Sequence, residues 1–155
     1  MPTPQLQNSA GAFGLSGLGT YTGDDRWEAV ETFIASTTIT RGDIVALSTS
    51  SGYVIDCLTN TTENKMVGIA AASATAGQEI PVVIAGPFYG AKKDNTVAVT
   101  AGDAVGRSAA VTASVLSISA ATAVTQLKDT GRVIGVVMAN QTAGDATADI
   151  FVCRF

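Results

Sequence analysis

The stretch MVGIAAASATAGQEIPVVIA, residues 66–85, has a second copy in the chain, VIGVVMANQTAGDATADIFV, residues 133–152. The two copies align without a gap, so that Gly68 falls on Gly135 and the two Thr-Ala-Gly triplets fall on each other. Each copy places short β-branched runs on either side of a glycine-containing turn, which is typical of paired β-strands. The chain is therefore predicted to contain two similar β-units.

The similarity extends upstream, where GDIVALSTSSGYVI begins at Gly42 and GDAVGRSAAVTASVLSI begins at Gly102. The internal similarity thus covers residues 42–85 and 102–152. Two such units packed together bury the apolar sides of both. We therefore expect an all-β fold, a single β-sandwich or barrel-like domain over residues 26–155.

A four-residue pattern, Thr-x-Gly-(Asp or Gln), marks four turns in these units, at residues 40–43, 75–78, 100–103 and 142–145. Glycine permits a positive φ, and a neighbouring Asp or Thr side chain can bond the turn backbone. The residues predicted to have this structural role are Gly42, Asp43, Gly77, Gly102, Asp103, Gly144 and Asp145.

The first of these turns contains Arg41-Gly42-Asp43, the tripeptide by which some extracellular ligands bind integrins. The glycine recurs in all four turns, whereas the arginine occurs in only one of them. We interpret the tripeptide as a turn before a strand, in which Arg41 occupies the variable position.

The composition points away from nucleic acid and towards protein partners. The 155 residues are 46% hydrophobic but only 14% charged, so much of the surface is expected to be covered by partners. The net charge of −4 opposes phosphate binding, and Lys92-Lys93 is the only basic pair. No apolar run is long enough to cross a membrane, and the N-terminus has no secretory signal pattern. Synthesis in a cytoplasm is expected.

Residue types used in common catalytic and metal sites are scarce. There is no histidine, and Cys57 and Cys153 lie far apart in the sequence. Buried reduced thiols are the favoured interpretation of the cysteines, and a disulfide remains an alternative. Asp24 and Asp25 beside Trp27 resemble a glycosidase carboxylate pair, but capping of the following segment is the simpler interpretation. We predict no enzyme activity, no cofactor and no metal.

Residues 1–25 combine Pro, Gly and Ser with isolated apolar side chains and little charge, so they are predicted to form an extended N-terminal arm, and a frayed terminus is the alternative. The segment 24–36 favours a strand, and 119–129 is the one serious helix candidate. Phe88-Tyr89 either anchors a partner or forms a strand that buries one ring and exposes the other, with lysines at an edge. The candidate partner contacts are Leu6, Phe13, Leu15, Leu18, Tyr21, Trp27, Phe88 and Tyr89.

The pattern TRGDIVAL…VGIAAASATAGQEIPVVIAG…VTAGDAVGRS…GRVIGVVMANQTAGDATADIFV resembles the capsid cement, or head decoration, proteins of tailed bacteriophages. The likeness covers residues 38–155 and rests on the Gly-Asp turns, the Gly68 and Gly135 strands and the Thr-Ala-Gly loops.

The resemblance implies a non-enzymatic virion protein that forms homotrimers on the outer capsid surface. It also implies that the trimer bridges subunits of the major capsid protein and stabilises the expanded shell. An alternative from another class is a receptor- or glycan-binding β-module of a fibre or adhesin, with Arg41-Gly42-Asp43 or Phe88-Tyr89 as the contact.

Overall fold

The computed structural model describes residues 20–22, 26–48, 53–57, 65–108, 111, 113–118 and 133–153. These residues form β-strands and no α-helix, which confirms the all-β prediction. The segment predicted to favour a strand, 24–36, contains β2, and the helix candidate 119–129 lies outside the described residues. The strands are β1 Thr20–Thr22, β2 Arg26–Ala35, β3 Ile44–Leu47, β4 Val54–Cys57, β5 Met66–Ala70, β6 Glu79–Lys92, β7 Ala104–Arg107, β8 Val115–Ser117, β9 Val133–Val137 and β10 Thr147–Val152.

The first barrel contains β2 to β5 and the first half of β6. Its strand order is β2-β4-β3-β5-β6, and β6 pairs back onto β2 to close the cycle. All of these pairings are antiparallel except that of β2 with β4. Closure leaves no strand of the cycle at an open edge.

The second barrel repeats this arrangement with the second half of β6 and with β7 to β10. Its order is β6-β10-β9-β7-β8. A parallel bridge between Lys93 and Val115 brings β8 back next to the end of β6. That bridge corresponds to the parallel pairing of β2 with β4 in the first barrel.

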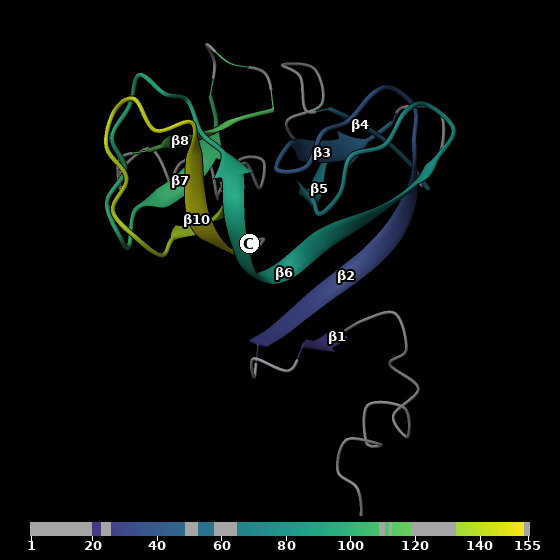
Figure 1. The fold of residues 1–155 in the computed structure, drawn as a ribbon, viewed down its shortest axis with the longest axis horizontal. Coiled ribbons are helices and arrows are strands. Elements are labelled where there is room, and N and C mark those ends of the chain that lie inside the picture. Colours follow the sequence, from purple (N-terminus) through teal and green to yellow (C-terminus); the bar gives the residue numbers. More distant parts are fainter. Residues whose placement is uncertain are drawn as a thin grey trace, which may run out of the picture.

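Strand β6 therefore belongs to both barrels, which lie on either side of its bend in Figure 1. Its residues 79–85 pair with β2, whereas residues 86–92 pair with β10. The change of partner falls at Gly86, which has a φ of 109°. Residues with a side chain rarely adopt such a φ, so glycine suits this junction.

The repeated strand glycines have a packing reason. A Cβ added to Gly68 would lie 2.1 Å from the carbonyl oxygen of Val83, and one added to Gly135 would lie 2.3 Å from that of Phe151. Because the two glycines lie equally close to these two carbonyl oxygens, Phe151 is the counterpart of Val83. The ungapped sequence alignment had matched Phe151 with Ile84, and it is wrong by one residue from Ala146 onward because the turn before β10 is one residue longer.

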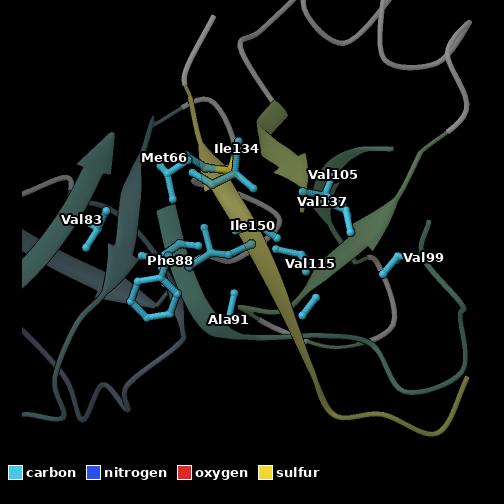
Figure 2. Close-up of a cluster of buried hydrophobic side chains, with 14 of the residues drawn as sticks. Met66, Val83, Phe88, Ala91, Val99, Val105, Val115, Ile134, Val137 and Ile150 are labelled. Atoms are coloured by element: carbon cyan, nitrogen blue, oxygen red, sulfur yellow. The ribbon is translucent and has the colours of Figure 1, made fainter. Parts of the chain in front are cut away.

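Two clusters of buried apolar side chains form the core. One lies within the first barrel and includes Val45, Ile55 and Val82. The other fills the second barrel and continues into the outward face of the first, so that Met66 lies beside Ile134 in Figure 2. The second cluster therefore joins the two barrels.

The predicted arm is described only in part. Residues 20–22 form β1, which pairs antiparallel with the beginning of β2 and places Tyr21 opposite Trp27. In Figure 1, β1 lies at the end of β2 that projects beyond the two barrels. Within the described residues, no helix has the length and hydropathy that a membrane span requires.

Candidate interaction surfaces and the seam between the barrels

The four repeated turns share one hydrogen-bonding pattern. In each, a side-chain oxygen of the fourth residue accepts the backbone N–H of the threonine three residues earlier, which holds the turn closed. The third residue of each turn is a glycine with a φ between 84° and 103°. The four acceptors are Asp43, Gln78, Asp103 and Asp145.

The turn at 40–43 differs from the other three because it docks on the second barrel. The N–H of Lys92 donates to the carbonyl of Gly42, and the N–H of Ile44 donates to the carbonyl of Ala113, each at 2.9 Å. In the first barrel the equivalent strands bond each other directly, from Ile34 N–H to Tyr53 C=O. Residues 42–44 thus stand between the end of β6 and Ala113, which precedes β8 in the second barrel. We call the contact of residues 40–44 with residues 88–92 and 113 the inter-barrel seam.

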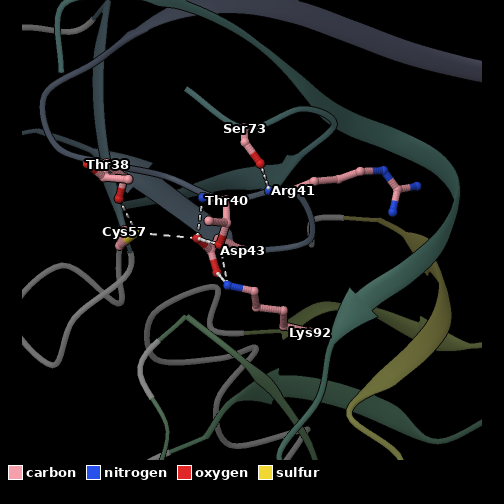
Figure 3. A network of polar contacts seen from close by, with 7 residues as sticks. All are labelled: Thr38, Thr40, Arg41, Asp43, Cys57, Ser73 and Lys92. Carbon is pink, nitrogen blue, oxygen red and sulfur yellow. Dashed lines mark hydrogen bonds and ion pairs between the residues drawn. The ribbon is translucent and has the colours of Figure 1, made fainter. Parts of the chain in front are cut away.

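Charged side chains reinforce the inter-barrel seam (Figure 3). Asp43 is only 5% exposed, and its carboxylate lies 2.6 Å from the ammonium of Lys92, which also contacts the hydroxyl of Thr40. The Arg41 guanidinium donates to the carbonyl of Tyr89 at 2.9 Å and lies 5.0 Å from the centre of the Phe88 ring. A cation at that distance from an aromatic ring is attracted to it.

These contacts revise the interpretation of Arg41-Gly42-Asp43. The tripeptide does form a turn before β3, as predicted. However, Arg41 does more than occupy a variable position, because its guanidinium binds the second barrel. The carboxylate of Asp43 is buried and paired, so it is not presented to an external receptor.

Both cysteines are free, half-buried thiols. Burial and then the nearby Asp43 carboxylate raise the pKa of Cys57 to about 11, because both disfavour the thiolate. Burial also raises the pKa of Cys153. The equivalent of Cys57 in the second barrel is Ser117, whose hydroxyl donates to Asp103 at 2.9 Å. The position thus supports the turn aspartate in both barrels.

The lysine pair does not lie at a strand edge, contrary to one of the two sequence interpretations. Lys93 is 4% exposed, and its ammonium donates to the carbonyls of Asp94 and Val97 at 2.9 and 2.6 Å. Asp94 accepts hydrogen bonds from Ser108 and Thr96, which lower the pKa of its carboxyl to about 2. Lys92 is held in the inter-barrel seam. Neither lysine is therefore free to steer an acidic partner.

The aromatic candidates separate into buried and exposed rings. Phe88 is 4% exposed and packs in the core, whereas Tyr89 is 43% exposed. This agrees with the interpretation in which the strand buries one ring and exposes the other. Tyr21 and Trp27 lie on the β1–β2 hairpin. Sequence reasoning missed Phe151, which is 45% exposed on β10 although it lies between buried neighbours. No local signal in the sequence identifies it, because Ile150, Phe151 and Val152 are all apolar and the outward face of β10 is known only from the structure. The other arm candidates, Leu6, Phe13, Leu15 and Leu18, lie outside the described residues.

Nothing in the described ranges gathers three or more side chains that could hold a metal ion. The carboxylates considered for glycoside hydrolysis, Asp24 and Asp25, lie outside those ranges. The described residues instead provide candidate binding surfaces. Tyr89 and Phe151 are exposed, and the β1–β2 hairpin projects beyond the two barrels. Such features can bind a partner through shape and apolar contact.

Comparison with known proteins gives a structural neighbour and no family. No protein-family model matches the chain, and a search of curated proteins found no significant match. A solved structure, the N base of the head fiber gp8.5 in bacteriophage phi29, is similar with a TM-score of 0.52 and 13% sequence identity. The match covers 81% of this chain and 94% of that one. One barrel is far shorter than that share of the chain, so the shared fold extends over both barrels.

Proposed function

We propose that this chain is a structural virion protein of a tailed bacteriophage that binds the outer surface of the capsid. The observation that carries the proposal is the two-barrel fold shared with the base of a phage head fiber. The resemblance of the repeated turns and strands to capsid cement proteins supports the same class of function.

We further propose that the protein acts as a homotrimer that bridges major capsid protein subunits and stabilises the expanded shell. Only 14% of its residues are charged, which suits a surface largely covered in an assembly. Many symmetric contacts stabilise a shell through avidity even when each contact is modest. Function through binding alone needs no reactive group, so the proposal includes no enzyme activity and no cofactor.

The proposal is tested by mixing the purified chain with undecorated expanded capsids and sedimenting the capsids. We expect saturable binding, with a fixed number of chains per capsid, and an increase in the temperature at which the shell opens. Unexpanded procapsids are the matched control. Equal binding to both forms, or no binding to either, would contradict the proposal.

The N-terminal arm is proposed to grip the capsid or a neighbouring subunit through its spaced apolar side chains, which include Leu6, Phe13 and Leu18. A variant without residues 1–22 is expected to occupy fewer capsid sites than the full chain at equal concentration. Full occupancy by the shortened chain would refute this role for the arm.

The fibre or adhesin alternative retains one favourable observation, since the structural neighbour is itself part of a fiber. In one version of this alternative, Arg41-Gly42-Asp43 is the receptor contact. The buried and paired carboxylate of Asp43 argues against that version. Replacing Arg41 with Ala separates the two functions. Loss of attachment to a receptor with retained capsid binding would favour the alternative.

A further inference from the structure

A row of apolar residues crosses the outward face of the first barrel. Ile44, Ile69 and Val83 lie directly opposite one another on β3, β5 and β6, and Val30 continues the row on β2. The first three are at most 1% exposed and belong to the core cluster that continues into the second barrel. The second barrel therefore covers this row, which we call the first row.

The second barrel carries a row at the same place in its own strands. Ala104, Val136, Phe151 and Pro87 lie opposite one another on β7, β9, β10 and β6. We call them the second row. Phe151 is 45% exposed and the other three are half-buried, so this row is not covered as the first row is.

Residues of the second barrel that belong to the same cluster as the first row have counterparts in the first barrel. Ile134 and Val152 of the second barrel are completely buried in the cluster that contains the first row. At the equivalent positions of the first barrel, Val67 is 7% exposed and Ile84 is half-buried. Val67 is thus enclosed in the core of the first barrel, whereas Ile84 packs against that core and stays partly accessible.

We propose that the second row binds the first barrel of a second copy of this chain, at the surface around Ile84. The occupant is inferred from the chain itself, because the contact between chains repeats the contact that joins the two barrels within one chain. This inference rests on the proposed function in one respect, which is that the proposed trimer requires a contact between subunits. Such a contact joins two different surfaces, and head-to-tail contacts of this kind form a ring where the rotation between subunits closes and a filament where it does not. The proposed trimer requires the closed form.

The contact between chains lacks the charged part of the inter-barrel seam. In the second barrel, Ala101 occupies the place of Arg41. Ile34 of the first barrel is the counterpart of Lys92, so Asp103 would meet no ammonium there. The association is therefore apolar. Added salt is expected not to weaken it, since screening acts on charges.

Sedimentation velocity of the full chain at increasing concentration tests the proposal. The wild-type chain is expected to associate, and Phe151→Glu is expected to weaken association by about tenfold or more, because a buried charge is placed in the contact. Val111→Glu is the matched control: it adds the same charge at a 39% exposed apolar residue outside the row, and it should associate like the wild type. A wild-type chain that stays monomeric at its highest soluble concentration would overturn the proposal, as would unchanged association of the Phe151 variant.

A second measurement does not depend on a disruptive substitution. A photoreactive phenylalanine analogue at position 151 is used in a mixture of ¹⁴N- and ¹⁵N-labelled chains, which identifies cross-links between chains by mass. We expect cross-links to peptides of the first barrel, including the one that contains Ile84. Cross-links only to the second barrel of the other chain, or none between chains, would overturn the proposal.

These tests use no capsid, so their failure is distinguishable from failure of the proposed function. A chain that binds expanded capsids but does not associate through the second row would support the capsid function and contradict this inference. A chain that associates as described but does not bind capsids would support this inference and contradict the capsid function.

Discussion

In the turns at residues 40–43 and 100–103, an aspartate carboxylate accepts the N–H of a threonine three residues earlier, with a positive-φ glycine between them. The first turn is fastened to the second barrel by an ion pair and by hydrogen bonds, whereas a Cβ added to Gly102 would meet nothing within 4 Å. The local sequence therefore determines the conformation of the turn. Whether the turn also makes contacts with a second barrel depends on the structure that lies next to it.

The largest effect is expected at the strand glycines, where the two barrels are most alike. Gly68→Ala and Gly135→Ala would each bring a Cβ within 2.3 Å or less of a backbone oxygen. We expect each to lower the free energy of unfolding by about 3 kcal/mol, because a paired strand must shift. Chemical denaturation measures this loss. A variant that retains its full stability would contradict the equivalence of the barrels.

The next effect separates the docked turn from the exposed one. Gly42→Ala adds a Cβ 2.8 Å from the carbonyl oxygen of Gly90, at a φ of 89°. It is expected to cost about 2–3 kcal/mol, since strain and overlap add, whereas Gly102→Ala should cost about 1 kcal/mol through strain alone. Equal losses in denaturant unfolding would show that the inter-barrel seam adds no constraint.

A double-mutant cycle measures the ion pair of the inter-barrel seam. We expect a coupling of about 1 kcal/mol between Asp43→Ala and Lys92→Met, a modest value because the lysine side chain is 40% exposed. High salt should reduce it. The matched cycle of Asp103→Ala with Lys92→Met should show no coupling. A coupling in the matched cycle as large as in the first would contradict the assignment of the pair.

Acid should destabilise the second barrel. Hydrogen bonds from Ser108 and Thr96 lower the pKa of Asp94 from 3.8 to about 2, and hydrogen bonds from Thr142 lower the pKa of Asp145. A carboxyl with a lowered folded pKa contributes stability that is present above its unfolded pKa and is lost as the pH falls towards the folded one. The equivalent of Asp94 in the first barrel is Ser36, which does not titrate.

We therefore expect the free energy of unfolding to fall between about pH 4 and pH 2. In Asp94→Asn the decrease should be smaller, and urea unfolding at the two ends of this range measures it. An unchanged decrease in the variant would show that Asp94 is not responsible.

The smallest effect is expected from Arg41→Ala, which gives the first turn the residue found at position 101 in the second. Loss of an exposed contact between a cation and an aromatic ring costs about 0.5 kcal/mol. Thermal unfolding should therefore change slightly and capsid binding should not change. Lost attachment with unchanged unfolding would favour a receptor-binding role for this turn.

The sequence was sufficient for the elements that depend on neighbours along the chain. The turn residues and the short β-branched runs follow from local rules, and the repeat of Gly68 at Gly135 identified two like units. The extra residue at Ala146 was missed because the two Thr-Ala-Gly turns match well enough to hide it.

The seam depends on contacts between segments far apart in sequence, and it was not predicted. Nothing near Arg41 indicates that its guanidinium reaches Tyr89, and the strand interpretation of Phe88-Tyr89 did not say which of the two rings is buried. Likewise, the exposure of Phe151 depends on whether another barrel covers β10. Local periodicity tells a buried face from an exposed one only when the covering element is known.

Cryo-electron microscopy of expanded capsids mixed with the purified chain tests the proposed function most directly. We expect ordered density on the outer surface, in groups of three chains that span adjacent capsid subunits, with both barrels of each chain visible. Bare capsids at saturating concentrations of the chain, or single chains without contact to one another, would contradict it.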